Sequence, residues 1–382
     1  MSSPLRVAMI IQGYHPCVGG AERQLASIIP LLQERGVVVQ VYTRRYAGLK
    51  AYEEVSGVPV YRLPVPGPKA MAALSFVLAV QPMLQKFRPQ IVHAHELLSP
   101  TTAAITAKRL MGVPVVVKVL RGGLLGDLAK LRKKLLGGRR ISWIKRHVDR
   151  FIAVSREIEA ELREISVRED RLAFIPSGVD TVRFYPLNRE EKDKLRSTLG
   201  LPHVPIVIFT GRMEVEKRVD RLMRIWPKVL AVHPQALLVL LGSGGQLETW
   251  KRMAGERVVF MGQVEEVTPF LQASDVFVLP SSTEGLSNAL LEAMSSGLAS
   301  VVTDVGGGRD AVVHGESGWL VPPDDMDTFQ EALIKLLADP SLRSKIGRSG
   351  RERVVRSFSL SYMVDKLCAL YDELMQEQGH RV

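Results

Sequence analysis

Short runs rich in Val and Ile alternate with longer segments of helical period along most of the chain. Continuous apolar runs of this length are typical of parallel strands that are buried on both faces, with helices between them. The cycle occurs twice, which predicts two doubly wound, Rossmann-like α/β domains. The expected strands lie near residues 6–11, 37–42, 91–94, 113–119, 151–154 and 171–175, and then near 206–210, 236–241, 258–261, 275–279 and 299–303.

A polar, Pro-bearing segment at 177–205 separates the two sets of strands. It includes the charged helix-like run NREEKDKLRSTLG, so it is the natural connection between the halves. We place the boundary within 180–187, which gives domains of 1–182 and 183–359. After Pro340 the pattern is helical, and the last predicted helix spans the run FSLSYMVDKLCALYDELMQ from Phe358.

The segment STEGLSNALLEAMSSG follows the apolar run DVFVLP and places two carboxylates, Glu284 and Glu292, across an expected loop-to-helix junction. Ser287 is the predicted N-cap of that helix. The amides from Gly285 to Leu290 would then face a ligand beyond the strand, and such helix starts attract phosphate groups. The alternative is an ordinary solvated Glu before a helix and another on its surface.

Two cations follow the strand predicted at 206–210, in the sequence GRMEVEKRVD. Arg212 and Lys217 would lie beyond the carboxyl end of that strand, where ligands collect in open α/β sheets. Their charges suit a diphosphate, including charge that develops on a leaving phosphate. The alternative is a solvated basic loop.

Composition agrees with a globular protein. The chain has 382 residues, 46% of them hydrophobic and 24% charged, which suggests about two or three domains. No run reaches the roughly 18 apolar residues of a membrane span, and the start of the chain lacks a signal-peptide pattern. We therefore expect a cytoplasmic protein. Its two cysteines, Cys17 and Cys368, are too far apart to predict a disulfide framework or a zinc site.

Part of the net charge of +11 is concentrated in one segment of the chain. Residues 130–150 carry one acid, Asp149, and nine basic side chains: Lys130, Arg132, Lys133, Lys134, Arg139, Arg140, Lys145, Arg146 and Arg150. Apolar residues interleave with them: Leu128, Leu131, Leu135, Leu136, Ile141, Trp143 and Ile144. This pattern predicts an amphipathic basic surface suited to an anionic membrane. A solvated basic helix is the alternative, and nucleic acid is disfavoured because no binding module is present.

These segments together carry a family resemblance. GRMEVEKRVD, STEGLSNALLEAMSSG and SVVTDVGGGRDAVVHGESGWLVPPDD resemble the donor-binding half of the retaining GT-B glycosyltransferases of family four. Upstream, LRVAMII, GYHPCVGGAERQL, IVHAHELLSP and FIPSGVDTVRFYP resemble further segments of the same family, so the match spans nearly the whole chain. The resemblance implies two Rossmann-like domains facing across a cleft, with residues 360–382, as part of the last helix, crossing back to pack onto the first domain.

The resemblance also implies roles for the residues of the second half. Arg212 and Lys217 would hold the diphosphate of a nucleotide sugar, and Glu292 would lie near the ribose. Glu284 would act with the neighbouring backbone around the sugar and phosphates, so the catalytic set is Arg212, Lys217 and Glu284. The donor-binding set adds Gly285, Leu286, Ser287, Asn288 and Glu292.

The first half would then supply the acceptor side. Gly19 and Gly20 allow close approach of backbone to a phosphate or an acceptor, and a tight hairpin-like turn is the less favoured alternative. GSGG at 242–245 also follows a strand, but we interpret it as packing support because isolated Gly-x-Gly runs are poor evidence. His93 and His95 are candidates for the acceptor side, or else strand-end histidines satisfied by backbone.

One position departs from the family. Many relatives end the fourth strand of the first domain with a Thr-x-His-like segment, whereas this chain has Leu120 in place of the histidine. Lys118, Arg121 and the 122–123 amides would fill that space, as in a branch of the family with a lysine and glycines there. We therefore include Lys118, Arg121 and His95 in the predicted substrate-binding set.

The reaction that follows is transfer of a sugar from a nucleotide-diphosphate donor to an acceptor hydroxyl, with retention and without a metal or cofactor. No Asp-x-Asp lies at a strand end, and PPDDMD near Asp324 is predicted to cap a helix. The expected setting is surface glycan or glycolipid assembly, in the cytoplasm or at the inner face of the plasma membrane. The alternatives are a GT-B sugar-nucleotide epimerase or phosphorylase and a non-catalytic nucleotide-sugar-binding protein. A dehydrogenase is disfavoured because GYHPCVGGAE lacks the dinucleotide fingerprint.

Overall fold

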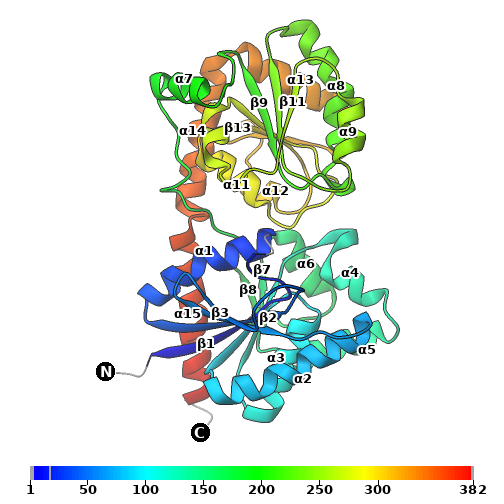
Figure 1. Cartoon of the computed structure of the whole chain (residues 1–382), viewed down its shortest axis with the longest axis vertical. Helices are drawn as coiled ribbons and strands as arrows, with labels where there is room; N and C mark the ends of the chain where they lie inside the picture. The colour runs from blue at the N-terminus through cyan, green and yellow to red at the C-terminus, as the bar shows by residue number, and fades with distance from the viewer. Residues whose placement is uncertain (1–3, 17–18, 380–382) are drawn as a thin grey trace. The chain divides into compact units, whose positions relative to one another are not determined.

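The computed structural model describes residues 4–16 and 19–379 and divides into two compact units (Figure 1). Unit 1 comprises Met1–Ser177 with Ser361–Val382, and unit 2 comprises Gly178–Leu360. The first division falls five residues before the predicted 182/183 boundary, and the second falls one residue after 359/360. The reason is pairing of the chain's two connecting segments, because the Val179 amide donates to the Phe358 carbonyl at 2.8 Å and the Leu360 amide donates to the Val179 carbonyl at 3.0 Å.

Unit 1 is built on an eight-stranded sheet of order β3-β4-β2-β1-β5-β6-β7-β8. All its strand pairs are parallel except β3 with β4. Strand order reverses between β1 and β5, which makes that position the switch point of the sheet. The strands are β1 (Leu5–Ile10), β2 (Val37–Arg44), β3 (Tyr52–Val55), β4 (Val58–Leu63), β5 (Ile91–His95), β6 (Val115–Val119), β7 (Arg150–Ala153) and β8 (Leu172–Phe174).

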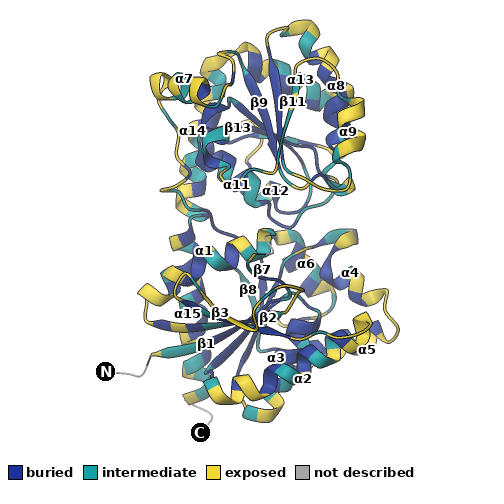
Figure 2. Ribbon diagram, viewed as in Figure 1, coloured by how far each residue is buried: buried dark blue, intermediate teal, exposed yellow. Residues whose placement is uncertain are grey.

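Helices cover both faces of this sheet, and the strands between them form the buried centre of the unit (Figure 2). They are α1 (Gly20–Glu34), α2 (Lys69–Phe87), α3 (Ser99–Met111), α4 (Asp127–Arg132), α5 (Gly137–His147), α6 (Arg156–Glu164) and α15 (Leu360–Gly379). Within the described residues α2 alone is long and apolar enough to span a membrane, with a mean hydropathy of 1.3 and 33% of that window buried.

The last helix, α15, belongs to the first unit, as the resemblance implied. The Tyr371 hydroxyl lies 2.7 Å from Nδ1 of His93, and both residues are buried. Asp365 pairs with Arg35 of α1, and Glu377 pairs with Arg150 at the start of β7. The sheet of unit 1 is therefore closed by residues that lie more than two hundred positions away in sequence.

Unit 2 is built on a parallel six-stranded sheet of order β11-β10-β9-β12-β13-β14, with its switch point between β9 and β12. Its strands are β9 (Ile206–Thr210), β10 (Leu237–Leu241), β11 (Val258–Gly262), β12 (Val276–Leu279), β13 (Ala299–Thr303) and β14 (Trp319–Val321). Its helices are α7 (Arg189–Thr198), α8 (Val219–Val232), α9 (Leu247–Met253), α10 (Thr268–Ala273), α11 (Asn288–Ser295), α12 (Gly308–Ala311), α13 (Met326–Ala338) and α14 (Pro340–Ser357).

The expected strands are all present, with ends shifted by two residues at most, whereas β3, β4 and β14 were not predicted. The sequence of β3 is YEEV, an exposed edge pattern with two acids, and β4 contains a Pro and an Arg. Only three residues form β14. β3 and β14 are edge strands and β4 lies between β3 and β2, and none of the three has the long continuous apolar run on which the prediction depended.

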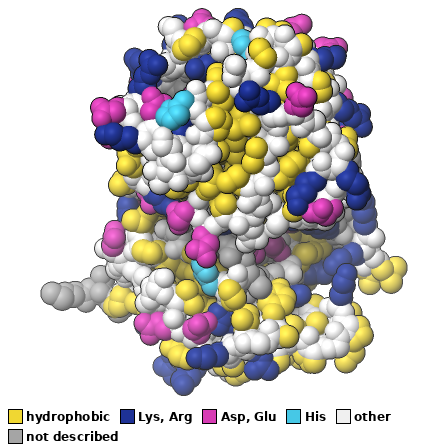
Figure 3. Space-filling model, turned by 45° about the horizontal axis from the view of Figure 1, so that its top comes forward, with side chains coloured by type: hydrophobic (Ala, Val, Ile, Leu, Met, Phe, Trp, Pro, Cys, Tyr) yellow, Lys and Arg dark blue, Asp and Glu magenta, His cyan; other side chains and the backbone are white. Residues whose placement is uncertain are grey.

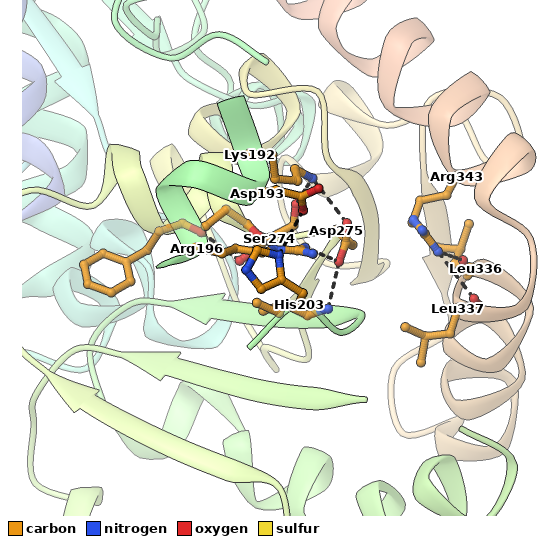
Figure 4. A network of polar contacts seen from close by, with 12 residues as sticks. Lys192, Asp193, Arg196, His203, Ser274, Asp275, Leu336, Leu337 and Arg343 are labelled. Carbon is orange, nitrogen blue, oxygen red and sulfur yellow. Dashed lines mark hydrogen bonds and ion pairs between the residues drawn. The ribbon is translucent and has the colours of Figure 1, made fainter. Parts of the chain in front are cut away.

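A buried ionic network anchors α7 to the amino ends of the unit 2 strands (Figure 4). The Asp275 carboxylate accepts from Arg196 at 2.7 Å, from Lys192 at 3.2 Å and from the Ile206 amide at 2.8 Å. Burial raises the pKa of Asp275, but Lys192, Arg196 and the Ile206 amide outweigh burial and hold that pKa below its usual value. The network lies at the opposite ends of the strands from the residues described next.

Candidate functional site

The central contact of unit 2 joins the loops that follow its two switch-point strands. Lys217 follows β9 and Glu284 follows β12, and Nζ of the lysine lies 2.5 Å from Oε1 of the glutamate. Each side chain is mostly buried, with 15% and 12% of its surface exposed. Lys217 and Glu284, two residues of the predicted catalytic set, therefore form an ion pair at the place where an open α/β sheet binds ligands.

Two serines and two glycines hold the Glu284 loop in place. The Ser281 hydroxyl donates to Glu284 Oε1 at 2.7 Å, and the Ser282 amide donates to the Glu216 carbonyl at 2.8 Å. Gly306 has a φ of +54°, and a Cβ there would lie 2.3 Å from the Glu284 carbonyl oxygen. The adjacent Gly307 packs equally closely against the next turn of the same loop. Side chains at either position would push the Glu284 loop away from Lys217.

Helix α11 begins where the sequence predicted. Ser287 is its N-cap, with the side chain accepting from the Leu290 amide at 3.4 Å. Gly285, Leu286 and Ser287 are buried, whereas Asn288 and Glu292 are half-buried on the helix. The start of the helix therefore directs its first-turn amides to the same edge of the sheet as Lys217 and Glu284.

Arg212 has a more open position than the other donor-side residues. Its side chain is 53% exposed and pairs with Glu216 at 3.0 Å. The loop behind it is supported by GSGG, as expected, because a Cβ at Gly242 would meet the Gly211 carbonyl at 1.8 Å and one at Gly244 would meet the Met213 carbonyl at 2.6 Å. Arg212 is thus an exposed cation with a long side chain, whereas Lys217 is mostly buried.

In unit 1, the Gly-Gly segment leads into α1 at the carboxyl end of β1. Gly19 is the N-cap of α1, and Gly20 is its exposed first residue. A Cβ on Gly19 would lie 2.4 Å from Oε2 of Glu22, so a side chain there would displace that carboxylate from its present position. Cys17 lies outside the described residues.

The predicted residues His95 and Lys118 lie in the interior of unit 1. They are paired neighbours on β5 and β6, each 2% exposed. Burial lowers the pKa of Lys118 to about 7. Burial first, and then nearby Lys118, lowers the pKa of His93 to about 3, and the ring of His93 stacks on that of His95. His95 ends β5, as expected, but both histidines are neutral interior groups, and His93 contacts the Tyr371 hydroxyl at 2.7 Å.

The segment after β6 differs from the expectation for its glycine amides. The Gly123 amide donates to Glu161 Oε1 at 2.5 Å, so it is not directed to a ligand, and the Gly122 residue is buried against α6. Arg121 is exposed. The position of Leu120 is fixed by its amide, which donates to the Asp127 carboxylate. The predicted role is therefore not supported for the Gly123 amide, because a neighbouring helix supplies its acceptor.

Sequence reasoning missed a polar group at the switch point of unit 1. Gln12 follows β1 and Glu96 directly follows β5, and the Gln12 amide nitrogen donates to Glu96 Oε2 at 2.6 Å. Burial, then Asp127, then Glu22 raises the pKa of Glu96 to about 7. The sequence did contain a signal for these two residues, because each is polar and lies just past the carboxyl end of a buried strand.

The basic segment forms two short helices, α4 and α5, with a turn between them. Most of its apolar residues pack inward and not on a lipid-facing surface, as Leu128, Leu131, Ile141 and Ile144 are buried. Leu135 and Leu136 in the turn are the exception, at 95% and 59% exposed. Among the described residues, no group of three or more His, Cys, Asp or Glu is arranged to hold a metal ion.

Two known sequence families match the chain in order. The "Glycosyl transferase 4-like domain" matches residues 19–178, and "Glycosyl transferases group 1" matches residues 204–339. The first match covers most of unit 1 from Gly19 onward, and the second lies within unit 2 and contains Arg212, Lys217, Glu284 and Glu292, whereas Gln12 precedes the first match. The predicted arrangement of domains therefore has a counterpart in recognised sequence families.

Individual relatives agree. The chain is 27% identical to a GDP-mannose-dependent monoacylated alpha-(1-6)-phosphatidylinositol monomannoside mannosyltransferase of Corynebacterium glutamicum, over 96% of this chain and 98% of the relative. It is 30% identical to alpha-maltose-1-phosphate synthase of Mycolicibacterium smegmatis, over 74% and 78%. Sucrose-phosphate synthase from Thermosynechococcus elongatus has the same fold, with a TM-score of 0.84, 23% identity and coverage of 98% and 100%. The chain therefore belongs to the group 1 glycosyltransferases, with the GT-B fold and the family-four motifs that its sequence resembles.

Proposed function

We propose that this glycosyltransferase binds a nucleotide-diphosphate sugar on unit 2, with the diphosphate at Lys217 and Arg212 and the transferred sugar beside Glu284. The observation that carries the proposal is the Lys217–Glu284 pair at the switch point between β9 and β12. An ammonium placed there can bind phosphate oxygens, and a carboxylate beside it can accept hydrogen bonds from sugar hydroxyls. The half-buried Glu292 on α11 is placed for the ribose in the same arrangement.

The chemistry of transfer explains why the cations are needed. Cleavage of the sugar–phosphate bond builds positive charge at the anomeric carbon and negative charge on the departing diphosphate. Lys217, Arg212 and the start of α11 would stabilise the diphosphate, so neither a metal ion nor a cofactor is required for that role. The acceptor hydroxyl would enter on the face that the nucleotide leaves, passing its proton to a phosphate oxygen, with retention of configuration.

The proposed acceptor is carried by a lipid in an anionic membrane. In unit 1, Leu135 and Leu136 are exposed beside Arg132, Lys133 and Lys134, which are exposed as well. Each basic side chain near anionic headgroups contributes roughly 1 kcal/mol, and exposed leucines add apolar burial. The Corynebacterium glutamicum relative is named for a phosphatidylinositol-based acceptor, which supports the same class of acceptor here.

A second exposed apolar surface of unit 1 lies on α2. Met71, Leu74 and Leu78 are 61%, 60% and 58% exposed and follow a helical spacing of three and four, so they share one face of the helix. Elsewhere, charged side chains of both signs are interspersed with apolar ones, as on the face drawn in Figure 3. The α2 stripe is therefore the alternative point of entry into the lipid interface.

The donor site is tested by thermal-shift binding of UDP-, GDP-, ADP- and TDP-sugars to the wild type and to Lys217→Met, Arg212→Ala and Glu292→Ala. We expect one nucleotide class to raise the melting temperature of the wild type and not that of Lys217→Met. Lys228→Met is the matched control, since Lys228 is 63% exposed and pairs only loosely with Asp327, at 3.7 Å.

Equal stabilisation of the wild type and Lys217→Met would contradict the placement of the diphosphate. Treatment with a chelator tests the metal-free mechanism in the same preparation. If transfer were abolished by the chelator and restored by a divalent cation, the proposed role of Lys217 and Arg212 as the sole counter-charges would be wrong.

A further inference from the structure

The switch point of unit 1 also carries polar groups. They are an amide and a carboxylate, whereas the switch point of unit 2 has a lysine beside its carboxylate. Gln12 and Glu96 lie just past β1 and β5, the switch-point strands of unit 1, and Lys217 and Glu284 lie in the loops that follow β9 and β12, the switch-point strands of unit 2. Open α/β sheets bind ligands at such points. Unit 1 therefore has the architecture of a second binding site, at residues to which the sequence assigned no role.

We propose that Glu96 and Asp127, with Gln12, form a site for the hydroxyl groups of an uncharged sugar or cyclitol, the part of the acceptor that receives the transferred sugar. This inference rests on the proposed function, because it names the acceptor class of the same reaction. It differs from the sequence prediction, which placed Lys118, Arg121 and backbone amides on the acceptor side and so favoured a phosphate group.

The backbone at Glu96 supports a role for its side chain. Glu96 has a φ of +83°, in the left-handed region where Gly or Asn is the ordinary occupant. Holding a glutamate there costs on the order of 1 kcal/mol or more, and such costs concentrate at binding sites. The side chain is half-buried and fixed by the Gln12 amide, so one carboxylate oxygen is oriented while the residue still reaches the surface.

Asp127 gives independent evidence of an unfilled polar site. The residue is 3% exposed, and its carboxylate accepts hydrogen bonds from the backbone of Leu97 and Leu120, which lie two residues past β5 and one residue past β6. Its Oδ2 atom is nevertheless buried with no hydrogen-bond partner among the described residues. A buried carboxylate oxygen without a donor is costly, and a ligand hydroxyl would satisfy it.

The charges around the site select the ligand. Asp127 and Glu22 are the acids that act most strongly on Glu96, and Lys130 opposes them only weakly. Three carboxylates repel a phosphate but accept hydrogen bonds from hydroxyls. Because the pKa of Glu96 is raised to about 7, its protonated form is also present near neutrality and can donate a hydrogen bond to a ring or hydroxyl oxygen.

Space for a ligand lies beside this group. An open hollow of about 430 Å³ follows β2 and β4, lined by Arg45, Tyr46, Gly48, Leu49, Pro64 and Pro66. A Cβ on Gly13 would meet both Glu22 Oε1, at 3.2 Å, and the Tyr46 hydroxyl, at 3.9 Å, so the Tyr46 side of the hollow lies near Glu22, although Gln12, Glu96 and Asp127 do not line it. Its volume lies within the roughly 300–1,000 Å³ of small-molecule sites.

The test is saturation-transfer NMR of the full chain with methyl α-D-mannoside, methyl α-D-glucoside, methyl α-D-galactoside and myo-inositol, each beside its phosphorylated counterpart. We expect at least one uncharged compound to receive saturation from the wild type, with an at least tenfold weaker affinity in Glu96→Gln and in Asp127→Asn. Glu54→Gln is the matched control, because Glu54 is exposed on the edge strand β3. Retained thermal unfolding confirms that each variant folds.

Three outcomes would overturn the inference. They are no transfer to any uncharged compound, equal transfer in the wild type and both variants, or tighter binding of the phosphorylated counterparts. A parallel titration with nucleoside diphosphates separates this inference from the proposed function, since Glu96→Gln should bind them as the wild type does. Loss of nucleotide binding in Lys217→Met with sugar binding intact would support both.

Discussion

Nζ of Lys217 lies 2.5 Å from Oε1 of Glu284, across the loops that follow two neighbouring strands. The lysine therefore has a carboxylate partner that any diphosphate must replace. Glu284→Gln removes this competitor, so we expect nucleoside diphosphates to bind several-fold more tightly while sugar transfer slows at least a hundredfold. Calorimetric titration and steady-state rates would measure the two effects. Glu248→Gln, 72% exposed in the same unit, should change neither.

Gly306 supports that pair from a separate loop. Gly306→Ala would place a Cβ 2.3 Å from the Glu284 carbonyl, at a φ of +54°. Gly200 also has a positive φ, of +67°, but nothing lies within 4 Å of its Cβ position. We expect Gly200→Ala to cost only the backbone strain of about 1–2 kcal/mol and to leave nucleotide affinity unchanged. Gly306→Ala should lower both stability and nucleotide affinity, and equal effects of the two substitutions would contradict the packing argument.

Glu96 should make the protein less stable as pH rises. Its pKa is raised from 4.5 to about 7 in the folded protein, so the folded state holds a proton that the unfolded state has lost. The penalty is absent below pH 4.5, grows between pH 4.5 and 7 and is constant above. Glu96→Gln should therefore be more stable than the wild type at pH 8, on the order of 2–3 kcal/mol, and similar at pH 4. Denaturant titrations at both pH values measure this, and a constant difference would exclude the carboxyl group as its source.

Asp275 has the opposite dependence. Its pKa is held below 3.8 in the folded protein, so its contribution is present above that value and is lost as pH falls below it. Asp275→Asn should destabilise unit 2 by about 3–5 kcal/mol at pH 7, because Lys192 and Arg196 would be left without their buried partner. Asp193→Asn is the control, since the Asp193 side chain is 42% exposed. Urea unfolding at pH 7 and pH 3 should show the difference shrinking in acid.

The lipid interface can be located by substitution. Leu135→Gln with Leu136→Gln should reduce binding to vesicles of phosphatidylglycerol and phosphatidylcholine at least tenfold, because burying each leucine contributes about 1.5–3 kcal/mol. Co-sedimentation measures this. Val182→Gln is the control, as Val182 is 84% exposed in unit 2. If only Leu74→Gln with Leu78→Gln weakened binding, the α2 stripe and not the basic turn would be the membrane surface.

The sequence predicted best the strands that are buried on both faces of their sheet. Strands such as Ile206–Thr210 and Ala299–Thr303 are mostly apolar and buried at every position because both faces are covered, and their ends mark where loops begin. Edge strands such as Tyr52–Val55 carry acids and have no such signature. Short-range signals were also sufficient at Ser287, whose capping depends only on residues three positions away.

Interactions between distant segments were not accessible in the same way. The Gln12–Glu96 hydrogen bond joins residues 84 positions apart, and the Gly123 amide finds its acceptor on another helix. The basic segment misled for a related reason. Its leucines alternate with cations, and only tertiary packing decides that Leu131 faces the core while Leu135 faces solvent.

The placement of α15 bears on how the protein is made. Ribosomes release a chain from its beginning, and domains generally fold as they emerge. Unit 2 is continuous in sequence and can fold as soon as it is released, whereas unit 1 needs Tyr371 over His93 and Glu377 beside Arg150. The part of the unit 1 sheet that α15 covers therefore stays exposed until that helix is synthesised. Chaperone dependence during translation should accordingly belong to the first half of the chain, although that half is made first.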